Sequence, residues 1–253
     1  VPPGHRPRGA ADVTARSVAR RLEAYAQLMR LDRPIGTWLL LWPVLWALWI
    51  AGAGRPPERV LIIFVLGVFV MRAAGCVIND FADRNIDPQV KRTRDRPLAA
   101  RRLSPYEALV LFGVLIAIAL WLVTRLDPLT IKLSVVGALL TVSYPLMKRW
   151  FPLPQFYLGL SFGGWGIPMA FAATLGAIPR VGWVLFLAAV LWAMVFDTLY
   201  AMVDREDDRK LGVRSSALLF ADMDRLIVGA MQAMMLFALH LAGRSMEFGP
   251  WYR

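Results

Sequence analysis

The sequence predicts an all-α protein, a polytopic transmembrane helical bundle, and three observations lead to that prediction. Hydrophobic residues make up 58% of the 253 residues, above the roughly 45–50% typical of soluble domains. They lie in long blocks, and the charged residues are concentrated between the blocks. Several blocks approach the ~20 apolar residues that a helix needs to cross a bilayer. The composition excludes a disordered chain, and a single cysteine, Cys76, excludes a disulfide framework.

Seven apolar blocks are candidate spans. Glycine and proline occur inside several of them, which membrane helices tolerate where helices pack closely or where backbone lines a cavity. The predicted spans cover residues 35–51, 60–77, 108–124, 129–147, 156–175, 182–203 and 226–242.

The first 30 residues are predicted to be a separate N-terminal region. Residues up to about Thr14 are rich in Pro, Gly and Arg and predict disorder. From about Arg16 to Arg30 the pattern predicts an amphipathic helix on the cytoplasmic surface. Residues 31–253 then form the transmembrane domain.

The distribution of basic residues predicts the orientation. The chain has 29 Lys and Arg and a formal net charge of +11, and 21 of these basic residues fall in four alternate segments that include the N-terminus. Cytoplasmic loops carry such an excess, so the N-terminus is expected to be cytoplasmic. In so apolar a chain the positive charge indicates a bilayer surface or an anionic substrate as partner, and no nucleic acid.

Two acidic clusters carry the chemistry. Asn79, Asp83 and Asp87 are spaced by four residues at the cytoplasmic end of the second block, with Asp80 between them, and on a continuous helix they share one face. Asp197, Asp204 and Asp208 close the sixth block and fall within about 40° of one another on a continuous helix.

Carboxylates at membrane depth are costly and usually functional. Because like charges at this spacing repel, a cation is expected between the clusters, and oxygen ligands favour Mg²⁺ with a substrate phosphate. Arg72, Lys148 and Arg149 are candidate anion-binding residues, Arg72 above all because a buried arginine needs an anionic partner. The alternative is that the acids are solvated helix ends beside arginines.

Six sequence blocks resemble the UbiA superfamily of intramembrane prenyltransferases, within it the 4-hydroxybenzoate polyprenyltransferases of ubiquinone biosynthesis. The two aspartate motifs, 79–87 and 197–208, are the superfamily signature. The matching blocks are LDRPIGTWLLLWPVLWALW, MRAAGCVINDFADRNID, VKRTRDRPLA, YPLMKRW, GWGIPMAFAA and DTLYAMVDREDDRKLGVRSSALLF.

The resemblance implies Mg²⁺-dependent transfer of a polyprenyl group from polyprenyl diphosphate to the 3-position of 4-hydroxybenzoate, in a bacterial inner membrane rather than a mitochondrial one. By motif position Asn79, Asp83, Asp204 and Asp208 would hold Mg²⁺, and Asp83, Asp204, Asp208 and Arg72 would be the catalytic group. Asp80, Asp87, Asp197, Arg72, Lys148 and Arg149 would support substrate binding.

The resemblance also implies about nine spans of about 20 residues each, whereas this chain supplies seven, so that part of the wall around the prenyl tail is expected to be missing. Three alternatives remain open at this point: a related prenyltransferase with another aromatic acceptor, a membrane transporter or channel, and an inactive truncated homologue. A transporter is expected to carry its acids near the bilayer centre, not at helix ends.

Overall fold

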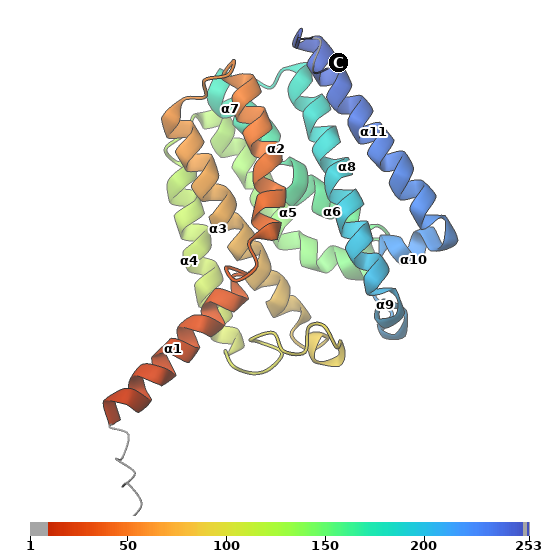
Figure 1. Ribbon diagram of the computed structural model, residues 1–253. Helices are drawn as coiled ribbons and strands as arrows, with labels where there is room; N and C mark the ends of the chain where they lie inside the picture. Colours follow the sequence, from red (N-terminus) through yellow and green to blue (C-terminus); the bar gives the residue numbers. More distant parts are fainter. Residues whose placement is uncertain (1–9, 250–251, 253) are drawn as a thin grey trace, which may run out of the picture.

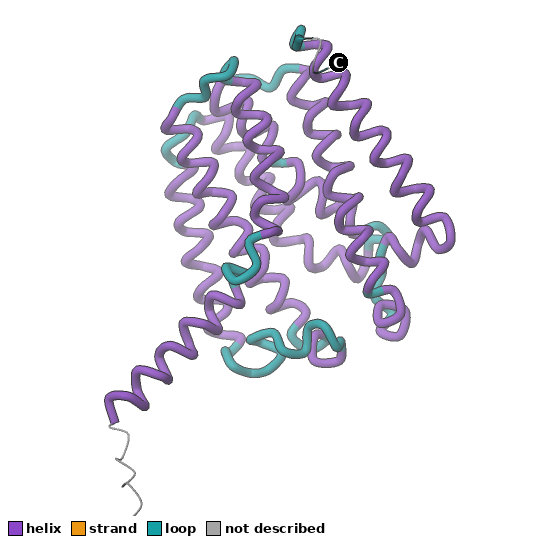
Figure 2. The backbone as a smooth tube through the Cα atoms, viewed as in Figure 1, coloured by secondary structure: helices purple, strands orange, loops and turns teal. Residues whose placement is uncertain are grey.

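Helices form all the regular secondary structure of a computed structural model, over the part of the chain that it describes, residues 10–249 and 252 (Figures 1 and 2). The α-helices are α1 (Ala10–Leu28), α2 (Ile35–Ala51), α3 (Glu58–Asp83), α4 (Pro105–Val123), α5 (Pro128–Trp150), α6 (Pro154–Leu158), α7 (Gly166–Leu175), α8 (Arg180–Val203), α9 (Arg205–Leu211), α10 (Ser216–Phe220) and α11 (Asp224–Ser245). Shorter turns are η1 (Asp87–Gln89), η2 (Gly159–Gly164) and η3 (Ala221–Met223).

All seven predicted apolar blocks are helical. Six helical segments, among the described residues, are long and apolar enough to cross a membrane, and α2 is the exception. Its 17 residues rise about 25 Å, against a hydrocarbon core of about 30 Å. The fifth predicted span is not one regular helix, because α6, η2 and α7 follow one another over Pro154–Leu175 and η2 is a π-helix.

Local sequence signals fix several helix ends. Ser104 caps α4 by accepting a hydrogen bond from the backbone N–H of Glu107, whose own side chain accepts from the Ser104 N–H. The Asp127 side chain caps α5 by accepting hydrogen bonds from the backbone N–H groups of Leu129 and Thr130. Gly176 ends α7 with φ of +68°, a left-handed conformation that glycine adopts without steric cost.

The core joins α2, α3, α7 and α8. Leu48, Phe64, Phe171 and Leu185 are buried in one apolar cluster there. Many large apolar side chains on the outer faces are exposed instead, as expected of helices that face lipid, since a soluble monomer rarely exposes so much contiguous apolar surface. They include Trp38, Trp42, Trp121, Leu139, Leu187, Leu236 and Phe237.

α1 extends away from the bundle (Figure 1). It begins at Ala10, earlier than predicted, and the part of the predicted tail before Ala10 lies outside the described residues. Near its C-terminal end, Ala24 and Leu28 are buried against α3 and α4, in a second apolar cluster with Val77 and Ala108. The Tyr25 hydroxyl donates a 2.7 Å hydrogen bond to Glu107, which ties α1 to the start of α4.

Helix directions place the functional segments at one end of the bundle. The segment between α3 and α4, the segment around α9 and the attached end of α1 lie at the same end, and the α2–α3 connection lies at the other (Figure 1). Both aspartate motifs therefore belong to a single end of the molecule, as the alternating charge predicts.

Candidate functional site

The first aspartate motif lies at the end of α3, and its residues do not all share one face. α3 ends at Asp83, so Asn79 and Asp83 are one helical turn apart on the same side. Asp87 lies beyond the helix in the turn η1 and is buried. The prediction that Asp87 continues this face is wrong, because the helix on which it depends stops four residues earlier.

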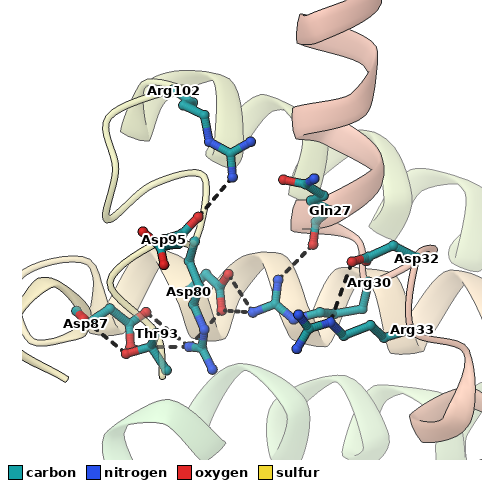
Figure 3. Close-up of polar contacts among 10 residues, drawn as sticks. Gln27, Arg30, Asp32, Arg33, Asp80, Asp87, Thr93, Asp95 and Arg102 are labelled. Atoms are coloured by element: carbon teal, nitrogen blue, oxygen red, sulfur yellow. Dashed lines mark hydrogen bonds and ion pairs between the residues drawn. The ribbon is translucent and has the colours of Figure 1, made fainter. Parts of the chain in front are cut away.

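Asp80 and Asp87 are held by arginines. The Asp80 carboxylate is 1% exposed and accepts hydrogen bonds from Arg30 at 2.8 Å and from Arg96 at 3.1 Å. Arg96 also donates to Asp87 at 3.0 Å. Burial away from water raises the pKa of the Asp87 carboxyl, although the Arg96 guanidinium opposes that shift. Figure 3 shows Asp80 between Arg30 and Asp87.

The second motif is divided between two helices. Asp197 lies in α8, Asp204 stands at the junction where α8 ends, and Asp208 lies in α9. The continuous helix assumed for these three residues is therefore interrupted at Asp204, whose ψ of 2° departs from helical geometry. A backbone hydrogen bond of 2.9 Å from the Asp208 N–H to the Asp204 carbonyl still keeps these two residues one turn apart.

Polar contacts hold the second motif in place. The hydroxyls of Thr198, next to Asp197, and Ser216 of α10 share a buried hydrogen bond of 2.8 Å. Gln155 of α6 accepts a 2.9 Å hydrogen bond from the Ser216 backbone N–H. Arg205, next to Asp204, forms an ion pair with Asp224 at the start of α11. The helices on both sides of the motif thus fix its backbone.

One ion pair joins the two motif regions. Arg92, in the segment that follows the first motif, donates to the Asp204 carboxylate of the second motif. Within the described residues, no three His, Cys, Asp or Glu side chains lie close enough together to hold a metal ion. The donors at this end are nevertheless amide and carboxylate oxygens, which suit Mg²⁺, and a cationic guanidinium already lies against one of them. The donor chemistry therefore fits a divalent cation.

A largely apolar cavity of about 180 Å³ lies deeper in the bundle, between α2, α3, α4, α5, η2 and α7. Among the described residues that line it, Arg72 is the only charged one. Arg72, Asn79 and Asp83 fall within about 40° of one another around α3, and Asn79 lies about 10 Å further along the helix than Arg72. One face of α3 therefore leads from the cavity to the first motif.

The Arg72 side chain packs closely on the start of α2. A Cβ atom on Gly36 would lie 2.5 Å from Arg72 Nη2, so only glycine leaves room for the guanidinium in this position. Lys148 and Arg149 end α5 at the same end of the bundle as the motifs, but their side chains lie outside the described part of the chain.

Sequence reasoning missed the separate roles of Arg30, Arg92 and Arg96. Arg92 and Arg96 belong to a run of loop arginines whose composition alone indicates topology and lipid binding. Arg30 lies 50 residues from Asp80 in the sequence, so no local pattern could pair them. The one signal in the sequence was Asp80 itself, an acidic residue of the first motif that needs a cationic partner when it is buried.

Comparison with known proteins gives concordant matches. The UbiA prenyltransferase family matches residues 40–252. The 4-hydroxybenzoate octaprenyltransferase of Nitrosococcus oceani is 58% identical over 233 residues, which are 92% of this chain and 81% of that protein. The protein of the same name from Methylococcus capsulatus is 58% identical over 236 residues, 93% of this chain and 80% of that protein.

Solved structures share the fold. A UbiA homologue from Aeropyrum pernix K1, in its apo form, superposes with a TM-score of 0.73 and 26% identity, covering 86% of this chain and 81% of that one. A UbiA homologue from Archaeoglobus fulgidus, bound to GPP and Mg²⁺, has a TM-score of 0.66 and 17% identity over 87% of this chain and 77% of that one. At that identity the second match bears on the fold alone.

Proposed function

Because this chain belongs to the UbiA prenyltransferase family, we propose that it transfers a polyprenyl group from polyprenyl diphosphate to the 3-position of 4-hydroxybenzoate. In this reaction the ring carbon ortho to the hydroxyl forms the new C–C bond and loses its proton, and diphosphate leaves. The relatives that carry the name 4-hydroxybenzoate octaprenyltransferase support this acceptor, and with it a place in ubiquinone biosynthesis.

The observation that carries the proposal is the Arg92–Asp204 ion pair, which joins the segment after the first aspartate motif to the second motif. Asn79, Asp83, Asp204 and Asp208 would hold Mg²⁺ there. A bound Mg²⁺ would neutralise the charge that develops on the departing diphosphate. Asp80, Asp87 and Asp197 would support this arrangement.

The cavity residues have two roles in the proposal. Arg72 is the charged residue among the described residues that line the cavity, and its guanidinium suits a diphosphate or the carboxylate of the benzoate. Apolar side chains such as Phe64, Val68 and Met169 would receive the prenyl chain nearest the diphosphate. They would also keep water from the allylic cation before the electron-rich ring attacks it. Lys148 and Arg149 are proposed as further anion contacts.

We place the protein in the bacterial inner membrane, with the N-terminus and both motifs on the cytoplasmic side. The excess of basic residues at the motif end supports this orientation. A transporter is disfavoured, because the cavity at the bundle centre is lined almost entirely by apolar residues and the acids lie at helix ends.

The test is an assay on membranes that contain the protein, with radiolabelled 4-hydroxybenzoate and a polyprenyl diphosphate. Label should enter the lipid-soluble fraction when Mg²⁺ is present, stop on addition of EDTA, and resume with excess Mg²⁺. Homogentisate and a dihydroxynaphthoate serve as competing acceptors. Transfer to one of them in preference to 4-hydroxybenzoate would contradict the proposal that 4-hydroxybenzoate is the acceptor. Transfer that continues in the presence of EDTA would contradict the proposed requirement for Mg²⁺.

A further inference from the structure

Asp80 lies between two guanidinium groups that come from opposite sides of α3 in the sequence. Arg30 follows α1 and contacts both Asp80 carboxylate oxygens at 2.8 Å (Figure 3). Arg96 precedes α4 and contacts one of these oxygens at 3.1 Å. The Asp80 side chain is 1% exposed, Arg30 19% and Arg96 24%. A carboxylate as buried as this one would strongly destabilise the folded protein if these two arginines were absent.

The backbone of Arg30 is left-handed at the end of α1. Its φ is 59°, in the left-handed region that glycine favours. The N–H groups of Arg30 and Leu31 bond to the carbonyls of Gln27 and Ala26, the pattern of a helix end at which glycine is the usual residue. Glycine would relieve the backbone strain at this position, but it would leave Asp80 without the Arg30 guanidinium.

Arg96 extends the contacts to the segment after the motif. It donates to Asp87 as well as to Asp80, and the Thr93 hydroxyl donates a 3.0 Å hydrogen bond to the Asp87 carbonyl. These bonds close the chain from Asp87 to Arg96 against the end of α3. Arg92 belongs to this closed segment, and from it reaches Asp204 of the second motif.

Asp80 lies beside the face of α3 on which metal binding is proposed, not on it. On α3 it is rotated about 100° from Asn79 and about 60° from Asp83. By holding Asp80, Arg30 and Arg96 fix the rotation of the helix end that carries Asn79 and Asp83.

We propose that Arg30 and Arg96 are positioning residues, which act through Asp80 and Asp87 to orient the first aspartate motif, and Arg92, toward the second. The inference rests on the proposed function for its metal and diphosphate. It assigns these two arginines to the Asp80 and Asp87 carboxylates rather than to a substrate.

The chain offers a matched pair of variants for the test. Arg101 has the same left-handed backbone, with φ of 55°, and the same two hydrogen bonds at a helical turn, but its side chain is exposed. Arg30→Gly and Arg101→Gly both relax the backbone, and only Arg30→Gly removes a guanidinium from Asp80. The Arg96→Met variant removes the other, with exposed Arg94→Met as its control.

Affinity for Mn²⁺ is measured on purified full-length protein in detergent without substrate, by electron paramagnetic resonance. Arg30→Gly and Arg96→Met should each weaken Mn²⁺ binding about tenfold or more, and Arg30→Lys should recover part of the loss. Hydrogen exchange over residues 79–96 should quicken in the metal-free Arg30→Gly protein. Arg101→Gly and Arg94→Met should match the wild type in both measurements.

Turnover supplies a second measurement. The positioning variants should lower kcat and raise the Mg²⁺ requirement, with KM for 4-hydroxybenzoate changed less than twofold. Mn²⁺ affinity of Arg30→Gly within twofold of wild type, or equal to that of Arg101→Gly, would overturn the inference, even if stability fell. If wild type binds Mn²⁺ but transfers no prenyl group, the proposed function fails while the Mn²⁺ comparison still decides the positioning role.

Discussion

Arg92 and Asp204, 112 residues apart in the sequence, form an ion pair between the segment after the first aspartate motif and the second motif. The Arg92 side chain is half exposed, so the pair is open to exchange with solvent ions. The Arg92 guanidinium binds the Asp204 carboxylate, which is also proposed to hold Mg²⁺. The pair is therefore the contact that must rearrange when a metal and a diphosphate enter.

Replacing Arg92 with alanine should have opposite effects on metal and diphosphate. Exposed ion pairs contribute up to about 1 kcal/mol, so freeing Asp204 should tighten Mn²⁺ binding by about two- to fivefold in the absence of substrate. The polyprenyl diphosphate should then bind more weakly, because a nearby cation is gone. Calorimetric titration with Mn²⁺ and KM measurements check both directions. Weaker Mn²⁺ binding in Arg92→Ala would contradict the competition.

Removing either central carboxylate should abolish catalysis without unfolding the protein. Asp83→Ala and Asp204→Ala each take one proposed metal ligand from a partly exposed position, and we expect turnover to fall by about a hundredfold or more. Glu206, exposed and two residues after Asp204, is the matched control, and Glu206→Ala should retain activity. Normal Mg²⁺-dependent turnover by either aspartate variant would refute the metal assignment.

The close packing of Gly36 on Arg72 gives a test that leaves the arginine itself in place. In Gly36→Ala the new methyl group would lie 2.5 Å from Arg72 Nη2 and must displace the guanidinium. We expect about a tenfold increase in KM for one substrate, similar to Arg72→Ala. Gly113→Ala, which meets nothing within 4 Å, is the control. Unchanged KM values for both substrates in Arg72→Ala would remove this residue from the site.

The close contact of η2 with α8 should make the protein's stability sensitive to a larger side chain in η2. A Cβ on Gly163 would lie 2.6 Å from the Ala193 Cβ and 3.2 Å from the Ala189 carbonyl oxygen, both on α8. Overpacking of this kind costs about 1–3 kcal/mol, so Gly163→Ala should lower the thermal midpoint in detergent. Gly229→Ala on α11 meets no neighbouring atom and should leave the midpoint unchanged or raise it slightly. Equal midpoints for the two variants would argue against tight η2–α8 packing.

The sequence predicted the helices well because their signal is local. Apolar blocks between charged segments mark each helix, and Ser104 and Gly176 mark helix ends by their own chemistry. The placement of both motifs at one end also followed from counting helix directions. The prediction that each span is one regular α-helix was wrong for the fifth span, because no residue pattern distinguishes its π-helical stretch from an ordinary helix.

The site was predicted by residue type but not by pairing. Asp87 fits the four-residue spacing after Asp83, yet α3 stops at Asp83 and Asp87 turns toward Arg96. Whether an acid takes part in an ion pair depends on which distant arginine the fold brings near it. Arg30 and Asp80 meet only because α1 packs against α3, a tertiary contact that the spacing of neither residue encodes.

The π-helical stretch has a consequence for how this wall tolerates changes in chain length. A π turn contains one residue more than the α turn that it replaces. Deleting Gly164 should therefore convert η2 to ordinary α-helix and leave α6 and α7 joined in regular register, whereas the same deletion inside α8 would rotate every following residue by about 100°. We therefore expect a single-residue deletion to disturb the fold less in this part of the cavity wall than in α8.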